Sequence, residues 1–498
     1  MSTTLHPATD NPTESLPTCG FAATDRLSVA ASNVVAMEDR WTPEHVLSLA
    51  PDAPSRKAAT KLSAPAPWSG LGCDTASASA AVWGECQGSG STPYRTVVDL
   101  TGPAYQCSCP SRKFPCKHAL ALLLRWSAGA GEPAGAPEWA VGWLGARRDR
   151  EEQQAARAAA PAAAPAEPDE ASALAAERRR ERRAARVAAG ASELAARLAD
   201  QLRGGLADAP NQGYAGWNDV AARMVDAQAP GLAGRARELG AVPSSGPGWP
   251  SRLLEEYGLC HLLATGYQRV DALPGPLAAT VRARVGFTVD AAEVLRGPHV
   301  RDRWLVLGAR DSADERITTR RIWLRGGETR QDALLLSFGR PGVGPELALP
   351  TGLLLDAELA FHPGARPLRA VLGPRFGAPV PPPPAEAVPD GLDLDAALDA
   401  YGRALGDDPW LESWPVVLRQ VVPTPTALGW ELVDRAGPAP AAIPVDRRGT
   451  PDAALWRLAA VSGGRPITLF GECGHRGFTP VTAWYPDGRQ IRTLGVTP

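Results

Sequence analysis

Apolar positions change their spacing several times along the chain, and each change predicts a different kind of element. Residues 1–40 are polar without any repeat of apolar positions, which predicts a disordered leader. The stretch WTPEHVLSLAPDAPSRKAATKL predicts short helices, with Thr42 as the N-cap of the first. Residues 81–86 and 94–100 are apolar and β-branched on either side of a Gly-Ser-Gly segment, which predicts a β-hairpin. HALALLLRW then has the apolar spacing of a helix.

The middle of the chain has helical patterns on both sides of a linker. Residues 127–170 predict a short helix, with Trp139 and Trp143 four positions apart, and then an Ala/Pro-rich linker that begins near residue 149. Residues 171–290 contain ASELAARLADQL, WNDVAARMVDAQA and PSRLLEEYGLCHLLATGY, which have the period of amphipathic helices. We therefore predict a helical region over these residues.

The C-terminal half changes to short apolar runs separated by turn residues. RWLVLGA, ITTRRIWL, ALLLSFG and LLLDAELAF predict an antiparallel β-rich region over residues 291–373. A Pro-rich linker follows at 374–390, and residues 391–498 predict an α+β region that opens with the helix LDAALDAYGRAL. With residues 41–126 as an N-terminal domain, the whole pattern predicts a multidomain α+β protein.

Composition narrows the class of protein. The chain has 498 residues, which is too long for one compact core, and its 44% hydrophobic and 21% charged residues are typical of globular domains. The net charge of −2 argues against binding a polyanion through bulk charge. The chain has no apolar run of membrane-spanning length and no secretory signal pattern at its N-terminus, so we expect a cytoplasmic protein with reduced thiols.

Three cysteines and one histidine gather in the stretch CSCPSRKFPCKH, with the spacing Cys107-x-Cys109-x6-Cys116-x-His118. A structural zinc site takes four Cys and His ligands in a tetrahedron. A Cys-x-Cys pair on an extended strand points both side chains to one face, and Cys116 and His118 lie at the start of the next predicted helix. The sequence therefore predicts one Zn²⁺ ion held between a strand end and a helix start. Buried inert cysteines and a redox pair are the alternatives, and the clustering without Cys-x-x-Cys argues against both.

A full set of four protein ligands leaves no coordination position for water, which favours a structural ion over metal catalysis. The sequence also lacks the Walker A, G-x-S-x-G and H-E-x-x-H patterns. We therefore expect a protein that is not an enzyme and has no catalytic residues.

The cysteine pattern, preceded by a predicted hairpin and followed by a predicted short helix, resembles the SWIM zinc finger. WTPEHVLSLAPD, WGECQGSGSTPYRTVVDL and RDRWLVLGARD are similar to a bacterial group of SWIM proteins found mainly in actinobacteria. The resemblance implies a ββα fold in which Cys107, Cys109, Cys116 and His118 are the zinc ligands. It also implies binding to DNA or to proteins, with a MoxR-type ATPase and a von Willebrand factor A protein as candidate partners.

Two basic segments leave open whether the partner is a protein or a nucleic acid. Residues 41–126 hold eight Lys and Arg against five Asp and Glu, which is weakly basic for a nucleic-acid-binding domain. The candidate nucleic-acid contacts are basic residues in the finger loop and in ERRRERRAAR: Arg112, Lys113, Lys117, Arg178, Arg179, Arg180, Arg182 and Arg183. Glu177 and Glu181 in the second segment favour a solvated helix face with i,i+4 pairs instead. We therefore favour protein–protein interaction, with an ATPase-containing system as one candidate, and keep DNA or RNA binding as the alternative.

Overall fold

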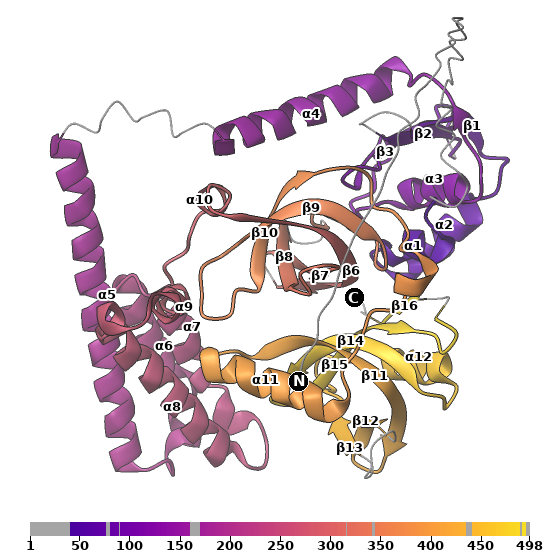
Figure 1. The fold of residues 1–498 in the computed structure, drawn as a ribbon. Coiled ribbons are helices and arrows are strands. Elements are labelled where there is room, and N and C mark those ends of the chain that lie inside the picture. The colour runs from indigo at the N-terminus through magenta and orange to yellow at the C-terminus, as the bar shows by residue number, and fades with distance from the viewer. Residues whose placement is uncertain are drawn as a thin grey trace, which may run out of the picture. The chain divides into compact units, whose positions relative to one another are not determined.

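The computed structural model describes residues 40–75, 80–88, 90–159, 170–314, 316–340, 344–434, 441–488 and 491–494. The predicted disordered leader, apart from residue 40, lies outside these ranges. Helices alternate with three separate β-sheets along the chain, which confirms the predicted multidomain α+β class (Figure 1). No helix within the described ranges is both long and apolar enough to cross a membrane.

The N-terminal domain packs three helices against a five-stranded sheet in the order β4-β3-β2-β1-β5. Its elements are α1 (Pro43–Ser48), α2 (Ala53–Leu62), β1 (Trp68–Asp74), β2 (Ala81–Cys86), β3 (Tyr94–Asp99), β4 (Ala104–Cys107), α3 (Lys117–Ser127) and β5 (Glu132–Pro133). Strands β2 and β3 pair antiparallel, so the predicted hairpin is confirmed. The Thr42 side chain accepts a hydrogen bond from the backbone N–H of His45, which confirms the predicted N-cap. Strand β1 was not predicted, because WSGLGCD has two glycines and no regular alternation.

Helix α4 (Glu138–Ala159) is much longer than the predicted short helix. The prediction of a linker from residue 149 is therefore wrong over 149–159, and residues 160–169 lie outside the described ranges. The added turns are rich in Ala, Glu, Gln and Arg, which are strong helix formers, and the first proline comes only at Pro161.

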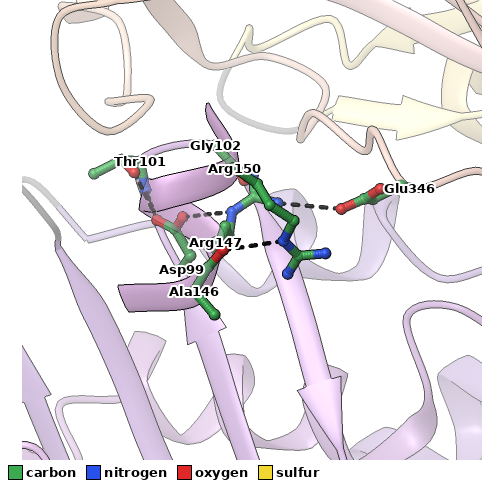
Figure 2. A network of polar contacts seen from close by, with 7 residues as sticks. All are labelled: Asp99, Thr101, Gly102, Ala146, Arg147, Arg150 and Glu346. Carbon is green, nitrogen blue, oxygen red and sulfur yellow. Dashed lines mark hydrogen bonds and ion pairs between the residues drawn. The ribbon is translucent and has the colours of Figure 1, made fainter. Parts of the chain in front are cut away.

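Arg147 fastens α4 to the N-terminal domain (Figure 2). Its guanidinium donates to the Asp99 carboxylate at 2.9 Å and to the Gly102 carbonyl at 3.1 Å, and it also reaches Glu346 at 3.2 Å. Asp99 is buried and also accepts from Thr101, so Arg147 satisfies a carboxylate that burial would otherwise destabilise.

The helical region has a continuous apolar core of its own. Its helices are α5 (Glu170–Gly204), α6 (Ala209–Asp226), α7 (Pro230–Leu239), α8 (Trp249–Gln268), α9 (Gly275–Val285) and α10 (Ala291–Val294). Leu194, Leu232 and Leu263, on three different helices, are completely buried in this core. The amphipathic periods predicted from the sequence therefore correspond to helices whose apolar sides face one another.

The β-rich region is a closed barrel in the order β10-β8-β7-β6-β9. Its strands are β6 (His299–Ala313), β7 (Thr318–Gly326), β8 (Asp332–Gly339), β9 (Leu354–Phe361) and β10 (Arg369–Arg375). The prediction of an antiparallel sheet is wrong at one pair, because β10 and β8 run parallel where the barrel closes. Apolar alternation identifies strands but does not determine their partners, so closure was not foreseen.

The Pro-rich segment 374–390 is attached to its surroundings at several points, unlike a free spacer. Val380 bridges to Leu354 of β9, and the Pro379 carbonyl accepts from Trp41 Nε1 at 2.8 Å. The Ala387 carbonyl accepts from Trp484 Nε1 at 3.0 Å. Backbone carbonyls of an extended Pro-rich chain have no partner within the chain and can accept hydrogen bonds from elsewhere. The buried indole N–H groups of Trp41 and Trp484 donate to two of them.

The C-terminal region is a six-stranded sheet in the order β13-β12-β11-β14-β15-β16. Its elements are α11 (Leu394–Asp407), β11 (Ser413–Thr426), β12 (Gly429–Asp434), β13 (Ala441–Pro444), α12 (Asp452–Ser462), β14 (Ile467–Gly474), β15 (Gly477–Trp484) and β16 (Ile491–Thr493). The opening helix and the mixture of helices and strands agree with the prediction. Central strand β11 was missed because it carries Pro415, Pro423 and Pro425, and proline argues against a central strand.

Candidate metal centre

The four predicted ligands lie on the end of one strand, the turn after it and the first turn of a helix. Cys107 is the last residue of β4, and Cys116 is the N-cap of α3, with His118 two positions further on. Cys109 lies in a bend and not on the strand, so the prediction of an extended Cys-x-Cys pair is wrong in that detail. The chain turns there, and the loop then returns both ends of the motif to one place.

The ligand atoms of Cys107, Cys109, Cys116 and His118 all lie within 4.8 Å of one another. His118 Nδ1 is 3.6 Å from Cys107 Sγ. A zinc tetrahedron with ordinary Zn–S and Zn–N bonds has edges of about 3.6 to 3.8 Å. The three sulfurs and one nitrogen therefore fit Zn²⁺ in both donor chemistry and spacing.

Hydrogen bonds from the surrounding chain support the sulfur atoms. Thr96 Oγ1 donates to Cys107 Sγ at 3.2 Å, and the Ala119 N–H donates to Cys116 Sγ at 3.5 Å. Backbone N–H groups of Cys109 and Ser111 donate to Cys107 and Cys109 respectively. Donors of this kind orient metal ligands and stabilise the thiolate form. Thr96 was not predicted, because it is placed by its register opposite Cys107, which the sequence does not reveal.

The protonation of the metal-free cluster prepares it for a cation. A hydrogen bond from the Cys116 thiol lowers the pKa of Cys107 to about 4 and the pKa of Cys109 to about 6. The same sharing of its proton with Cys107 and Cys109 raises the pKa of Cys116. The lowered pKa values favour the thiolate form of Cys107 and Cys109, and a bound metal ion would displace the remaining thiol proton.

The cluster lies at the edge of the domain's core, with Cys107 and Cys109 half-buried. Cys116 and His118 are buried, and the Tyr94 ring lies 4.9 Å from the His118 ring. All four positions of a tetrahedral ion would be taken by protein atoms, so no open position is left for water or substrate. This is the arrangement of a structural zinc site. No second cluster of potential ligands occurs among the described residues.

The predicted basic residues fall into two sets on different elements. Arg112, Lys113 and Lys117 are exposed around the finger loop, and Lys113 pairs with Asp52 at 2.5 Å. Arg178, Arg179, Arg180 and Arg182 are exposed on α5.

Three residues of the α5 segment have local partners. Arg182 Nε donates to the Arg178 carbonyl at 3.0 Å. Arg183 is half-buried, and its guanidinium lies 4.2 Å from the centre of the Phe287 ring. The Arg180 guanidinium pairs with Glu177 at i,i+3, where i,i+4 pairs were predicted. The segment is therefore a mainly solvated helix face.

Two family models match the chain, and together they define its class. A model of the SWIM zinc finger matches residues 94–127, which contain the whole cluster. The geometry and this match make the chain a zinc-finger protein with a structural site. A model of the SWIM-associated four-helix bundle domain matches residues 182–285, within α5 to α9. The chain is thus a SWIM-type zinc finger protein, as the resemblance implied. No curated protein and no solved structure matches it.

Proposed function

We propose that this protein is a non-enzymatic, cytoplasmic interaction protein whose zinc finger is a structural module and whose partner is another protein. The burial of helix α3 is the observation that carries the proposal. Residues Ala119 to Leu123 are completely buried, and Trp126 is nearly so. A helix that forms the centre of a domain has no face left for a ligand.

The burial of α3 argues against nucleic-acid reading by this finger. Zinc fingers that read DNA insert an exposed helix into the major groove. Of the three loop cations, Lys113 is already paired with Asp52, which leaves Arg112 and Lys117 for phosphates. Two charges contribute little to the electrostatic term that dominates nucleic-acid affinity.

Exposed apolar side chains in the C-terminal region support a protein partner. Trp456 is 65% exposed and contacts Trp430 edge to face at 5.2 Å, and Leu428 is 96% exposed. Tryptophan is enriched among residues that dominate binding energy at protein interfaces. The resemblance makes a MoxR-type ATPase and a von Willebrand factor A protein the first partners to test.

Nucleic-acid binding is the second candidate because four arginines of α5 are exposed, namely Arg178, Arg179, Arg180 and Arg182. Such a run on one helix could follow a phosphate backbone without reading bases. Glu177 and Glu181 in the same segment weaken this positive field.

Fluorescence anisotropy of labelled DNA and RNA with the zinc-loaded full chain separates the two candidates. We expect no salt-sensitive binding to either nucleic acid. Such binding would be tight at about 50 mM salt and would weaken steeply by about 200 mM. Tight, salt-sensitive binding that is lost in Arg179→Gln/Arg182→Gln would overturn the proposal. For the protein candidate, Trp456→Ala should abolish binding to the purified partner, while Leu254→Ser, an exposed apolar site on α8, should leave it unchanged.

A further inference from the structure

A polar pocket of about 110 Å³ lies where the N-terminal domain meets the C-terminal sheet. Arg56 of α2 lines it from one side, and Tyr485, Arg492 and Thr493 line it from the other. One water occupies about 30 Å³ in the liquid, so the pocket has room for three or four waters or one tetrahedral oxyanion. This pocket is separate from the zinc cluster, and no residue of the cluster lines it.

Arg56 connects the two sides of the pocket. One of its terminal nitrogens, Nη2, donates to Thr493 Oγ1 at 3.1 Å, which links residues 437 positions apart. Its Nε–H is buried and has no hydrogen-bond partner. This nitrogen has almost no accessible surface, so an anion in the pocket would reach the Arg56 guanidinium at its terminal nitrogens.

Positive charge gathers around Arg56 without a matching carboxylate. Burial is the main cause that lowers the pKa of Arg56, and the charges of Arg492 and Arg457 lower it further. No carboxylate among the described residues contributes the opposite effect. The acid that lines the pocket, Glu44, is exposed and forms no ion pair with Arg56. Among the described residues no carboxylate forms an ion pair with Arg56, and two further guanidinium groups add to the positive charge around it.

We propose that this pocket binds a phosphate-type oxyanion. The guanidinium groups of Arg56 and Arg492 donate to the anion, and the hydroxyls of Thr493 and Tyr485 supply neutral donors. Charge-assisted hydrogen bonds from arginine are the strong ones for phosphate. The anion relieves the repulsion among the arginines and links the N-terminal domain to the C-terminal sheet. Its source is either free phosphate or the phosphoryl group of a small phosphorylated molecule.

Titration calorimetry of the zinc-loaded full chain tests this site, with sodium phosphate as the probe and sodium chloride of equal ionic strength as the reference. We expect saturable binding of one phosphate per chain. Arg492→Gln should weaken it at least about tenfold, and so should Arg56→Gln. Because Arg492 is exposed, its variant keeps the test valid if Arg56→Gln does not fold. Arg403→Gln, an exposed arginine of α11, is the matched control and should bind like the native chain.

Neutralising Glu44, the acid that lines the pocket, should change the affinity for phosphate in the opposite direction. Glu44→Gln should tighten phosphate binding about twofold to fivefold, because it removes an exposed repulsive charge. AMP that binds more tightly than phosphate would identify a phosphorylated molecule as the source, and equal affinity would identify free phosphate. Either result supports the site. Absence of saturable binding by both, or equal binding in Arg492→Gln, would overturn it.

Discussion

The two segments that match family models are held together in different ways. The finger, residues 94–127, has a loop between Cys107 and Cys116 without helix or strand, and metal ligands fix both of its ends. The bundle, residues 182–285, has a core of buried apolar side chains on every helix. The comparison teaches that the loop of the finger depends on a single ion, whereas the bundle depends on many small contacts. Perturbing each should therefore leave the other unchanged.

Zinc removal should have the largest effect, and it should be confined to the finger. Structural zinc contributes on the order of 10 kcal/mol to the folding of isolated zinc fingers at neutral pH. We expect a chelator to accelerate amide hydrogen exchange across residues 94–127 by orders of magnitude. Exchange in α5 to α9 should not change. Peptide-resolved mass spectrometry measures both regions in one experiment.

Cys116→Ser should reproduce the effect of the chelator. Cys73→Ser is the matched control, because Cys73 is a buried thiol of the same domain that donates to the Gly131 carbonyl and is not a ligand. Full zinc retention in Cys116→Ser, or loss of zinc in Cys73→Ser, would contradict the ligand assignment.

A cavity in the bundle should destabilise the bundle and leave zinc binding by the finger unchanged. Leu263 of α8 is completely buried, so Leu263→Ala should lower the free energy of unfolding by about 2 to 5 kcal/mol. Its zinc content should remain that of the native chain. Urea unfolding followed by circular dichroism measures the first quantity, and metal analysis measures the second. Zinc loss in this variant would mean that the two segments are coupled.

Removing the hydroxyl that supports Cys107 should weaken the finger without destroying it. Thr96→Val keeps the shape of the side chain but loses the donor to Cys107 Sγ. Loss of such a supporting contact typically costs 10-fold to about 100-fold in metal affinity. Competition with a chromophoric chelator measures the change, and Thr60→Val, an exposed threonine on α2, should show none.

Acid should weaken zinc binding and leave the bundle intact. Near neutral pH the ion must displace the proton that the sulfurs share, so affinity should fall about tenfold for each pH unit lost. The decline should steepen below about pH 6, where Cys109 binds a proton in the metal-free cluster. Chelator competition at several pH values measures the slope. A constant affinity from pH 8 to about 5 would contradict the thiolate ligands.

A surface change on α5 should have the smallest effect. Arg179 is exposed and makes no ion pair among the described residues, so Arg179→Gln should change the free energy of unfolding by less than about 0.5 kcal/mol. Thermal unfolding measures this. A larger loss would mean that the arginine run stabilises the bundle.

The finger and the bundle also differ in what the sequence alone could reveal. The four ligands were predictable because a metal site needs particular residue types at short spacing, and Cys107 to His118 lie within one loop. The helices of the bundle were predictable because their apolar residues recur with the period of a helix. Strand β11 was missed because its three prolines argue against a central strand. Thr96 and the barrel closure between β8 and β10 were not predictable, because each depends on which strands pair and in what register. Those choices are made by contacts between residues far apart in the chain.

X-ray absorption at the zinc edge tests the central claim of a closed structural site most directly. The account predicts three sulfur ligands at about 2.3 Å and one nitrogen ligand at about 2.0 to 2.1 Å, with one zinc per chain. A water oxygen in the first shell, or fewer than three sulfurs, would contradict it and would reopen the question of catalysis at this metal.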